Sequence, residues 1–184
     1  MFKYQDILFR PVEEGDLENL RRLRNDSSTW VHLTDPNLIS PSMQQFWFKR
    51  ICESTDIKAF SVFENNLASP TIQEGDFLGF IRMDQIDSVN RSARIGCDIV
   101  PEKRGKGYGK KIYEALLKYF FDDCNFNRLW LCVLDTNLIA RCLYMKIGFK
   151  EEGKYRQAVW RDGKWHDYII MSILRDEYCE EKKR

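Results

Sequence analysis

The sequence predicts an α+β fold, also described as mixed α/β, in which strands and helices do not alternate strictly. Two observations support this class. The spacing of hydrophobic residues changes from helical to strand-like after the second expected helix. Two β-rich runs near the C-terminal end enclose Asp162-Gly163, which is a strong hairpin signal. A doubly wound fold needs regular βαβα alternation, so the order of elements excludes it.

The chain begins with a strand and a helix. The run DILFRPV, residues 6–12, has strand character and stops near Pro11. The helix GDLENLRRLRND follows, with Asp16 as its expected N-cap. Its apolar stripe consists of leucines at helical spacing, namely Leu17, Leu20 and Leu23.

A second helix comes after a loop-like segment, residues 27–40. Ser40 or Ser42 is expected to cap this helix, and Pro41 suits its first turn. Its expected stripe contains four apolar side chains: Met43, Phe46, Trp47 and Ile51.

Strands dominate the rest of the chain. Three of them precede a glycine-rich segment and a helix that buries Ile112 and Leu116. A fully apolar strand, of the kind buried on both faces, then precedes a helix that ends at Gly148. The strands before the terminal hairpin are residues 58–64, 76–86, 92–100 and 128–134.

The totals exclude several classes of protein. A length of 184 residues suits one domain, which we place at residues 1–184, with 178–184 as a frayed, charged tail. Hydrophobic and charged fractions of 43% and 31% are those of an ordinary globular protein. The net charge is +1, so no global field attracts nucleic acid or an anionic membrane. We expect neither as a partner.

The cysteines and the N-terminus indicate a reducing compartment. None of the six cysteines stands in a CxxC pattern or at a metal-ligand spacing with histidine, so we expect reduced thiols and no metal. The sequence shows no N-terminal signal peptide and no apolar run long enough to span a bilayer. We therefore expect a cytoplasmic protein.

One segment combines glycine with positive charge: VPEKRGKGYGKK, from Val100 to Lys111. It fails the P-loop pattern because Ile112 stands where a serine or threonine is needed, and it fails GxGxxG because Lys110 replaces the last glycine. What remains is a strand, a glycine turn and a helix. Unsatisfied amides at such a helix start favour an anion-binding turn. A solvated lysine-rich loop has the same composition, and these residues alone leave both interpretations open.

Two motifs make the sequence resemble the GNAT superfamily of acyl-CoA-dependent N-acyltransferases. The glycine segment matches [RQ]-x-x-G-x-[GA] with Arg104-Gly105-Lys106-Gly107-Tyr108-Gly109. One helix and one strand later, N-x-x-A-x-x-x-Y-x-K-x-G-F is matched by Asn137, Ala140, Tyr144, Lys146, Gly148 and Phe149. The resemblance covers nearly the whole chain and is weaker before Ala59. The two ends look most like the branch of ribosomal-protein alanine, spermidine and amino-sugar acetyltransferases.

The resemblance implies a fold and a cofactor position. The fold would have a central, mostly antiparallel sheet of six to seven strands, splayed in the middle and flanked by about four helices. Acetyl-CoA would be the cosubstrate, with its pantetheine arm on the backbone of Ile99 and Val100. Its pyrophosphate would lie on the amides of residues 104–109, beside the charges of Arg104, Lys106 and Lys110. The other implied cofactor-binding residues are Gly105, Gly107, Tyr108, Gly109, Asn137, Ala140 and Lys146.

The resemblance also makes Tyr144 the candidate general acid, which would protonate the leaving thiolate. Without the motif, a tyrosine at this spacing is a packed aromatic on an amphipathic helix. The general base is open. Ala93-Arg94 stands where many relatives carry an acidic residue, which leaves Asp98, His166 or an ordered water as candidates. An exposed strand carboxylate and a satisfied histidine are the alternatives for the two side chains.

Acceptor contacts are expected from the first two helices, the loop between them and the terminal hairpin. The named candidates are Arg24, Asn25, Trp30 and His166, with Trp47 and Trp160 as further aromatics. The leading hypothesis is direct attack of a primary amine on acetyl-CoA in a ternary complex, with an amino sugar or a polyamine as acceptor. The alternatives are a protein N-terminus as acceptor and a non-catalytic acyl-CoA-binding module. We expect a monomer or a homodimer.

Overall fold

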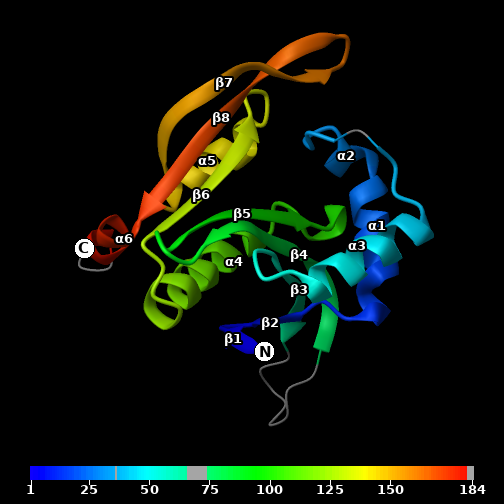
Figure 1. Ribbon diagram of the computed structural model, residues 1–184, viewed down its shortest axis with the longest axis horizontal. Helices are drawn as coiled ribbons and strands as arrows, with labels where there is room; N and C mark the ends of the chain where they lie inside the picture. The colour runs from blue at the N-terminus through cyan, green and yellow to red at the C-terminus, as the bar shows by residue number, and fades with distance from the viewer. Residues whose placement is uncertain (36, 66–73, 182–184) are drawn as a thin grey trace.

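One eight-stranded sheet forms the centre of the molecule in the computed structural model, which describes residues 1–35, 37–65 and 74–181 (Figure 1). The strands lie in the order β1-β2-β3-β4-β5-β6-β8-β7, and every neighbouring pair is antiparallel except β5 and β6. Their bounds are β1 Phe2–Tyr4, β2 Ile7–Pro11, β3 Lys58–Asn65, β4 Glu74–Asp87, β5 Ser92–Ile99, β6 Arg128–Leu134, β7 Lys150–Arg161 and β8 Lys164–Leu174.

The sheet confirms the expected mixed, mostly antiparallel fold and adds one strand to the expected count. The additional strand is β1, which pairs with β2 from Phe2 opposite Phe9 to Tyr4 opposite Ile7. Gln5, with φ of 52°, turns the chain between them. Stacking of the Phe2 ring on Phe9, with centroids 4.4 Å apart, holds this edge in place.

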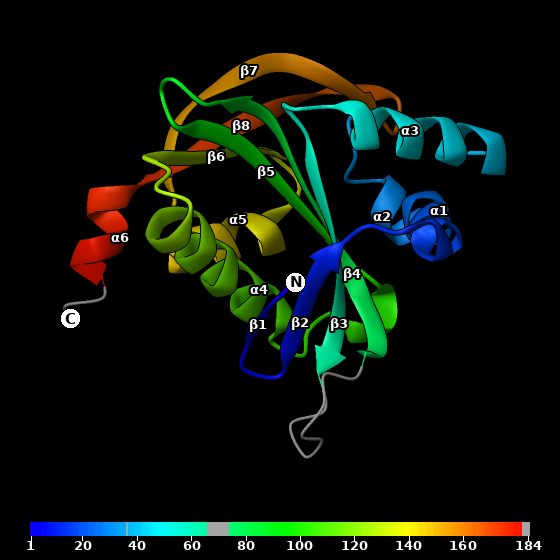
Figure 2. The same cartoon turned by 60° about the horizontal axis from the view of Figure 1, so that its bottom comes forward.

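Six helices flank the sheet, where about four were expected. They are α1 Leu17–Asn25, α2 Ser27–Trp30, α3 Pro41–Glu53, α4 Tyr108–Leu117, α5 Leu138–Lys146 and α6 Arg175–Glu181. In Figure 2, α4 and α5 lie together beneath β5 and β6, while α1, α2 and α3 lie together on the other side of β4. None of the helices in the described ranges is long and apolar enough to cross a membrane.

Several local predictions are confirmed. The Ser40 side chain caps α3 by accepting from the Met43 amide at 3.2 Å, and Pro41 opens the helix. Gly148 follows α5 with φ of 101°, the left-handed conformation of a helix C-terminus. Asp162-Gly163 turns the terminal hairpin, with φ of 49° and 76°.

Other expectations were wrong. The segment predicted as a loop contains α2, because the Asp26 side chain accepts from the amides of Ser28 and Thr29 and so nucleates a helical turn. The predicted frayed tail is helical up to Glu181, because Tyr178 is buried against Phe121. Residues 182–184 lie outside the described ranges. Strand β6 is not covered on both faces, since Trp130 and Cys132 are only half-buried.

Asp16 has a different role from the one predicted. Its side chain makes no cap hydrogen bond to α1. It pairs with the Arg10 guanidinium at 2.7 and 2.9 Å and accepts from the Ser61 hydroxyl at 2.7 Å. Burial opposes the ionisation of Asp16, but hydrogen bonds from Arg10, the Glu13 amide and Ser61 lower its pKa overall. This buried cluster ties β2 and β3 to the start of α1.

The sheet splays between β5 and β6. The two strands pair only through Ser92–Arg128, Ala93–Leu129 and Arg94–Trp130, and beyond these pairs each keeps only its other neighbour. Figure 1 shows the two strands meeting at one end and diverging towards the other. This confirms the splayed middle strands expected from the resemblance.

Asp16→Ala should destabilise the folded protein by about 3–5 kcal/mol, because it leaves the buried Arg10 guanidinium with a poorer set of partners. Urea unfolding at pH 7 measures the change. The stabilisation by Asp16 should be present above the pKa of an unfolded aspartate and should be lost as the pH falls through the lowered folded-state value.

Glu18→Ala is the matched control, because Glu18 pairs with Arg21 and Arg22 on the exposed face of α1. Equal urea midpoints for the two variants would contradict a structural role for the Asp16 cluster.

Candidate active site

The glycine turn leads directly from the splayed strand into α4. Gly105 and Gly107 have φ of 72° and 86°, the left-handed region in which glycine replaces other residues at low cost. Helix α4 begins at Tyr108, and Gly107 as its N-cap has no side chain to satisfy the first amides. Within the described ranges, no protein acceptor meets the amides of residues 105–110. The turn therefore presents a group of free N–H donors at the positive end of a helix, as an anionic group requires.

The third glycine of the motif has a different task. A Cβ atom on Gly109 would lie 3.0 Å from Leu143 Cδ2, on α5, and 3.6 Å from Ile99 Cδ1. Gly109 thus lets α4 pack closely against α5 and the end of β5. Only the first two glycines shape the backbone of the turn.

Arg104 holds the turn in place rather than facing outward. Its Nε donates to the Ile99 carbonyl at 2.8 Å, and its other nitrogens donate to Ser28 and to the Thr29 hydroxyl, both on α2. Its own amide donates to Pro101. These contacts use the guanidinium that was expected beside a pyrophosphate, so we assign Arg104 a positioning role.

Tyr108 also turns its polar atom away from the turn. Its hydroxyl donates to the Glu64 carboxylate at 2.5 Å, and Lys103 pairs with the same carboxylate at 2.8 Å. The exposed Lys106 and Lys110 remain the side-chain cations at the rim. Lys106 and Lys110 therefore supply the positive side-chain charge that was expected beside the turn.

The backbone of Ile99 and Val100 is already partly bonded. Besides its bond from Arg104, the segment donates from Val100 N–H to Leu78 at 3.0 Å, and the Val100 carbonyl accepts from Lys103 at 3.0 Å. A carbonyl oxygen has two lone pairs, so Ile99 and Val100 can each accept one further bond. The contact of these two residues with a pantetheine arm stays a prediction, in which each carbonyl would accept one further hydrogen bond.

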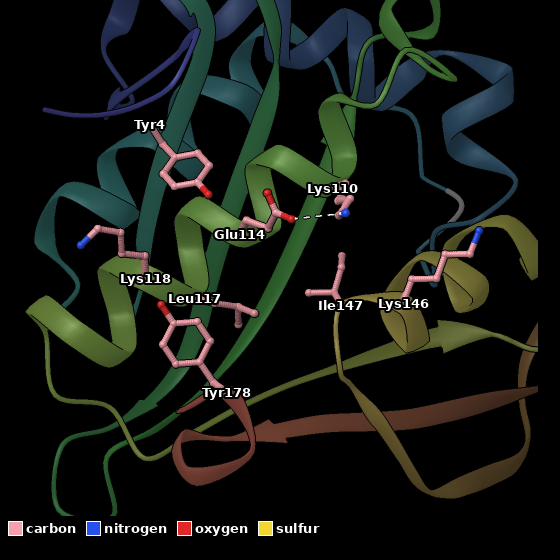
Figure 3. A pocket seen from close by; sticks show the side chains of 8 residues that line it. All are labelled: Tyr4, Lys110, Glu114, Leu117, Lys118, Lys146, Ile147 and Tyr178. Carbon is pink, nitrogen blue, oxygen red and sulfur yellow. Dashed lines mark ion pairs between the residues drawn. The ribbon is translucent and has the colours of Figure 1, made fainter. Parts of the chain in front are cut away.

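A cavity of about 400 Å³ lies between α4, α5, β1 and α6. Figure 3 shows Lys110 and Lys118 from α4 and its extension, Lys146 from the end of α5, and Tyr4 and Tyr178 from β1 and α6. Lys110 also contacts Glu114 at 3.6 Å. The structure thus brings Lys110 and Lys146 to one basic cavity, and their contact with the nucleotide end of a cofactor stays a prediction.

Asn137 and Tyr144 are positioned by α5. The Asn137 side chain caps this helix by accepting from the Ala140 amide at 3.2 Å. Two turns later, the Tyr144 hydroxyl accepts a hydrogen bond of 3.3 Å from Tyr113. Burial raises the pKa of Tyr144 well above that of a free phenol, so its hydroxyl keeps the proton at neutral pH. That is the state a general acid needs before it acts.

A second cavity, of about 820 Å³, opens on the opposite face of β5, between α1, α3 and β4. Asp98 lines it, next to Arg24 and Arg82. Side chains alternate between the faces of a strand, so Asp98 faces this cavity while Cys97 and Ile99 face α4 and α5. No described residue forms a hydrogen bond or ion pair with the Asp98 carboxyl.

Burial raises the pKa of Asp98, and the charges of Arg82, Arg24, Arg104 and His32 counteract only part of this effect. A half-buried, unpaired carboxyl with a raised pKa is better suited to accept a proton from an amine than an ordinary surface aspartate. Asp98 thus stays a candidate for the base that the sequence left open.

The other predicted acceptor contacts separate into two groups. Arg24 lines the cavity, where burial lowers its pKa. Asn25 does not, because its amide makes two bonds to the Ile39 backbone and anchors the loop before α3. Trp30 lies under the Arg161 guanidinium, 5.0 Å from its ring centre. His166 is buried and pairs with Asp135 at 3.2 Å. Neither Trp30 nor His166 lines the cavity.

The aromatic predictions divide in the same way. Trp47 lines the cavity and also packs edge-on against Phe80, with ring centroids 5.6 Å apart, so packing and cavity roles coincide. Trp160 is half-exposed on β7 and pairs with Trp165.

Sequence reasoning missed two groups of residues near Asp98. Arg82 and Arg94 line the cavity from β4 and β5, and His32, between α2 and α3, lies near enough to act on the pKa of Asp98. Burial, together with the charge of Arg104, lowers the pKa of His32. The alternation of FIRMD placed Phe80, Arg82 and Asp84 on one strand face, a signal that was available.

Comparison with known proteins identifies the family. The model of the acetyltransferase (GNAT) domain matches residues 6–150. The chain therefore belongs to the GNAT acetyltransferases, as its two motifs predicted. It is 34% identical to the putative ribosomal N-acetyltransferase YdaF of Bacillus subtilis over 118 residues, 64% of each chain. It is 27% identical to the spermidine N(1)-acetyltransferase of Vibrio cholerae over 96% of this chain and 98% of that one.

Solved structures of the Vibrio cholerae enzyme have the same fold. A complex with CoA and spermine superposes with a TM-score of 0.85 at 24% identity, covering 95% of this chain and 99% of that one. A dodecameric form superposes with a TM-score of 0.79 at 26% identity, covering 96% and 98%.

Asp98→Asn should lower turnover by about 10²-fold or more and at the same time stabilise the folded protein at pH 8. The folded-state pKa of Asp98 is raised, so the wild-type protein loses stability as the pH rises through it, and the neutral amide removes that loss. Acetyl-transfer rates and thermal unfolding between pH 4 and pH 8 measure both effects. The stability gain should shrink towards pH 4.

Asp176→Asn, an exposed change in α6, is the control for loss of a carboxylate. Wild-type turnover in Asp98→Asn would rule out Asp98 as the base.

Proposed function

We propose that this protein transfers an acetyl group from acetyl-CoA to a primary amine, by direct attack in a ternary complex. One observation carries the proposal: the splay between β5 and β6 lies between the proton-holding Tyr144 on the α5 side and the unpaired Asp98 on the cavity side. The free amides of the glycine turn stand at the end of the same strand. In this proposal, a different reactant approaches the site from each face of the sheet.

The side chains divide the proton transfers between them. Asp98, or a water bound to it, takes a proton as the amine nitrogen attacks the thioester carbonyl carbon. The carbon–sulfur bond then breaks, and the Tyr144 hydroxyl gives its proton to the departing sulfur. Holding the two reactants in register is the largest contribution of the protein. Backbone N–H groups along the splayed strand would stabilise the oxyanion that forms between these steps.

The residues present fit acetyl-CoA as cosubstrate. Its pyrophosphate would lie on the amides of residues 105–110, and its nucleotide end near Lys110 and Lys146. The CoA complex of the Vibrio cholerae enzyme supports this assignment. That no metal takes part stays a prediction, because a structure of the Vibrio cholerae enzyme in complex with manganese ions is among the similar ones. No group of three His, Cys, Asp or Glu side chains suited to a metal occurs in the described ranges.

A small molecule is the proposed acceptor. The spermidine acetyltransferases among the relatives support a polyamine, and an amino sugar remains the other small-molecule candidate. A protein N-terminus is the alternative acceptor, supported by the name of the Bacillus subtilis relative. A monomer or homodimer was expected, but the dodecameric Vibrio cholerae enzyme supports a larger assembly, which light scattering would measure.

Incubation with acetyl-CoA and a panel of amines should release free thiol well above the rate of hydrolysis for at least one acceptor. The panel should contain polyamines, amino sugars and peptides with free N-termini. Thiol release is read with a disulfide reagent, and mass spectrometry identifies the acetylated product. CoA binding by calorimetry without thiol release from any amine would instead favour a non-catalytic acyl-CoA-binding module.

Tyr144→Phe should lower kcat by about 10²-fold while leaving the Kd for CoA within about twofold, because the phenol acts only on the leaving sulfur. Steady-state kinetics and calorimetry give the two values. Tyr155→Phe on β7, which is half-exposed, serves as the matched control. An unchanged kcat for Tyr144→Phe would leave the tyrosine with a packing role only.

A further inference from the structure

The floor of the 820 Å³ cavity is a row of cross-strand pairs on β4 and β5. Starting at the splay, the row consists of Phe80 opposite Asp98, Arg82 opposite Gly96, and Asp84 opposite Arg94. Successive members of the row are two residues apart, about 7 Å along the strand, and they face the same side of the sheet. An acceptor whose amine lies at Asp98 would therefore extend over Arg82.

Arginine dominates this floor beyond Asp98. Asp84 pairs with Arg94 through two hydrogen bonds of 2.6 and 2.8 Å, and Arg82 contacts the same carboxylate at 2.7 Å. Two guanidiniums thus share one carboxylate. Asp84 is buried, whereas the Arg82 side chain is 44% exposed. The surplus positive charge is on the side chain that the acceptor would meet.

The space over Arg82 is open. Gly96, its cross-strand partner, has no side chain, and a Cβ atom built there would meet nothing within 4 Å. A guanidinium has five N–H donors, and contact with Asp84 occupies only part of them. The guanidinium donors that Asp84 does not use are suited to planar, bidentate binding of a carboxylate or phosphate.

The remaining walls carry charges of both signs, with Asp35 and Asp56 beside Arg24 and Arg50. Arg50, at the end of α3, has no ion pair or hydrogen bond to any residue in the described ranges. Arg24 is held only loosely, 3.8 Å from the exposed Asp35. Three aromatic side chains offer an apolar surface between the charges, namely Phe46, Trp47 and Phe80.

We infer that the acceptor carries a carboxylate or phosphate group in addition to its primary amine, and that Arg82 binds this anion. The inference rests on the proposed function, because the amine is placed by Asp98. A polyamine is the wrong partner for this floor, since its second and third ammonium groups would lie against guanidiniums. The acceptor is therefore an amino acid or an amino-sugar phosphate in chemical class, rather than a polycation.

Matched amines test the inference directly. Hexylamine, 6-aminohexanoate and 1,6-diaminohexane differ only in the group at the far end, and glucosamine with glucosamine 6-phosphate forms the phosphate arm. With acetyl-CoA saturating, kcat/KM from thiol release should be at least about tenfold higher for an acid-bearing member than for its neutral partner. The arm with the larger ratio distinguishes carboxylate from phosphate. Equal or higher values for 1,6-diaminohexane or spermidine would overturn the inference.

Arg82→Gln should remove the tenfold advantage of the acid-bearing amines, so that the ratio of kcat/KM between 6-aminohexanoate and hexylamine falls to about one. Arg82→Glu should reverse the order in favour of 1,6-diaminohexane. Arg22→Gln, on the exposed face of α1, controls for the loss of a guanidinium outside the cavity. A loss that is equal for all amines in Arg82→Gln would assign Arg82 a structural role and reject the inference.

A binding measurement separates this inference from the proposed function. If no amine drives thiol release, calorimetry of the CoA-saturated protein with 6-aminohexanoate, hexylamine and the two sugars still reports on the cavity. Preferential binding of an acid-bearing member that Arg82→Gln abolishes would support the anion site without catalysis. No preference in either pair would refute it.

Discussion

The site depends on the separation of β5 from β6 after three residue pairs. Beyond Arg94 and Trp130, β5 remains with β4 and β6 with β8, so the sheet opens where a parallel ladder would otherwise close it. Gly79 on β4 allows β5 to approach closely, because a Cβ at Gly79 would lie 2.2 Å from the Asp98 carbonyl oxygen. Asp98 and Tyr144 lie on opposite faces, and yet the charge of one contributes to the pKa of the other.

The two sides of the opening present different kinds of interaction, namely backbone N–H donors on one side and charged side chains on the other. In the proposed complex, backbone amides and a helix end on the α4 side would bind an anion without any particular side chain. On the α1 and α3 side, the charged side chains of a cavity that contains Asp98 and several arginines would meet the acceptor. Under the proposed function, the first side would hold the cofactor and the second would select the acceptor. Relatives that share the fold at about a quarter identity can therefore differ in the amine they acetylate.

The sequence predicted those features whose causes are local. The turn at Asp162-Gly163, the cap at Ser40 and the stop at Gly148 each follow from the conformational preference of one or two residues. The features it missed depend on contacts distant in the chain. β1 forms by pairing with β2 and by ring stacking, and α6 extends into the expected tail because Tyr178 packs against Phe121. Asp16 resembled a helix cap by position but is held instead by Arg10 and Ser61.

For the site, the sequence by itself determined the residues of the proposed cofactor side: the glycine turn, Asn137 as the cap of α5 and Tyr144 two turns later. These residues are positioned by backbone conformation and helical spacing, which depend on residues close together in the sequence. Only the tertiary structure decided the acceptor side. Strand alternation shows that Arg82 and Asp84 share a face, but not which residues of β5 lie opposite them. The register between β4 and β5 places Arg82 beside Asp98 and over Gly96, and register is set by packing and strand irregularities across the whole sheet.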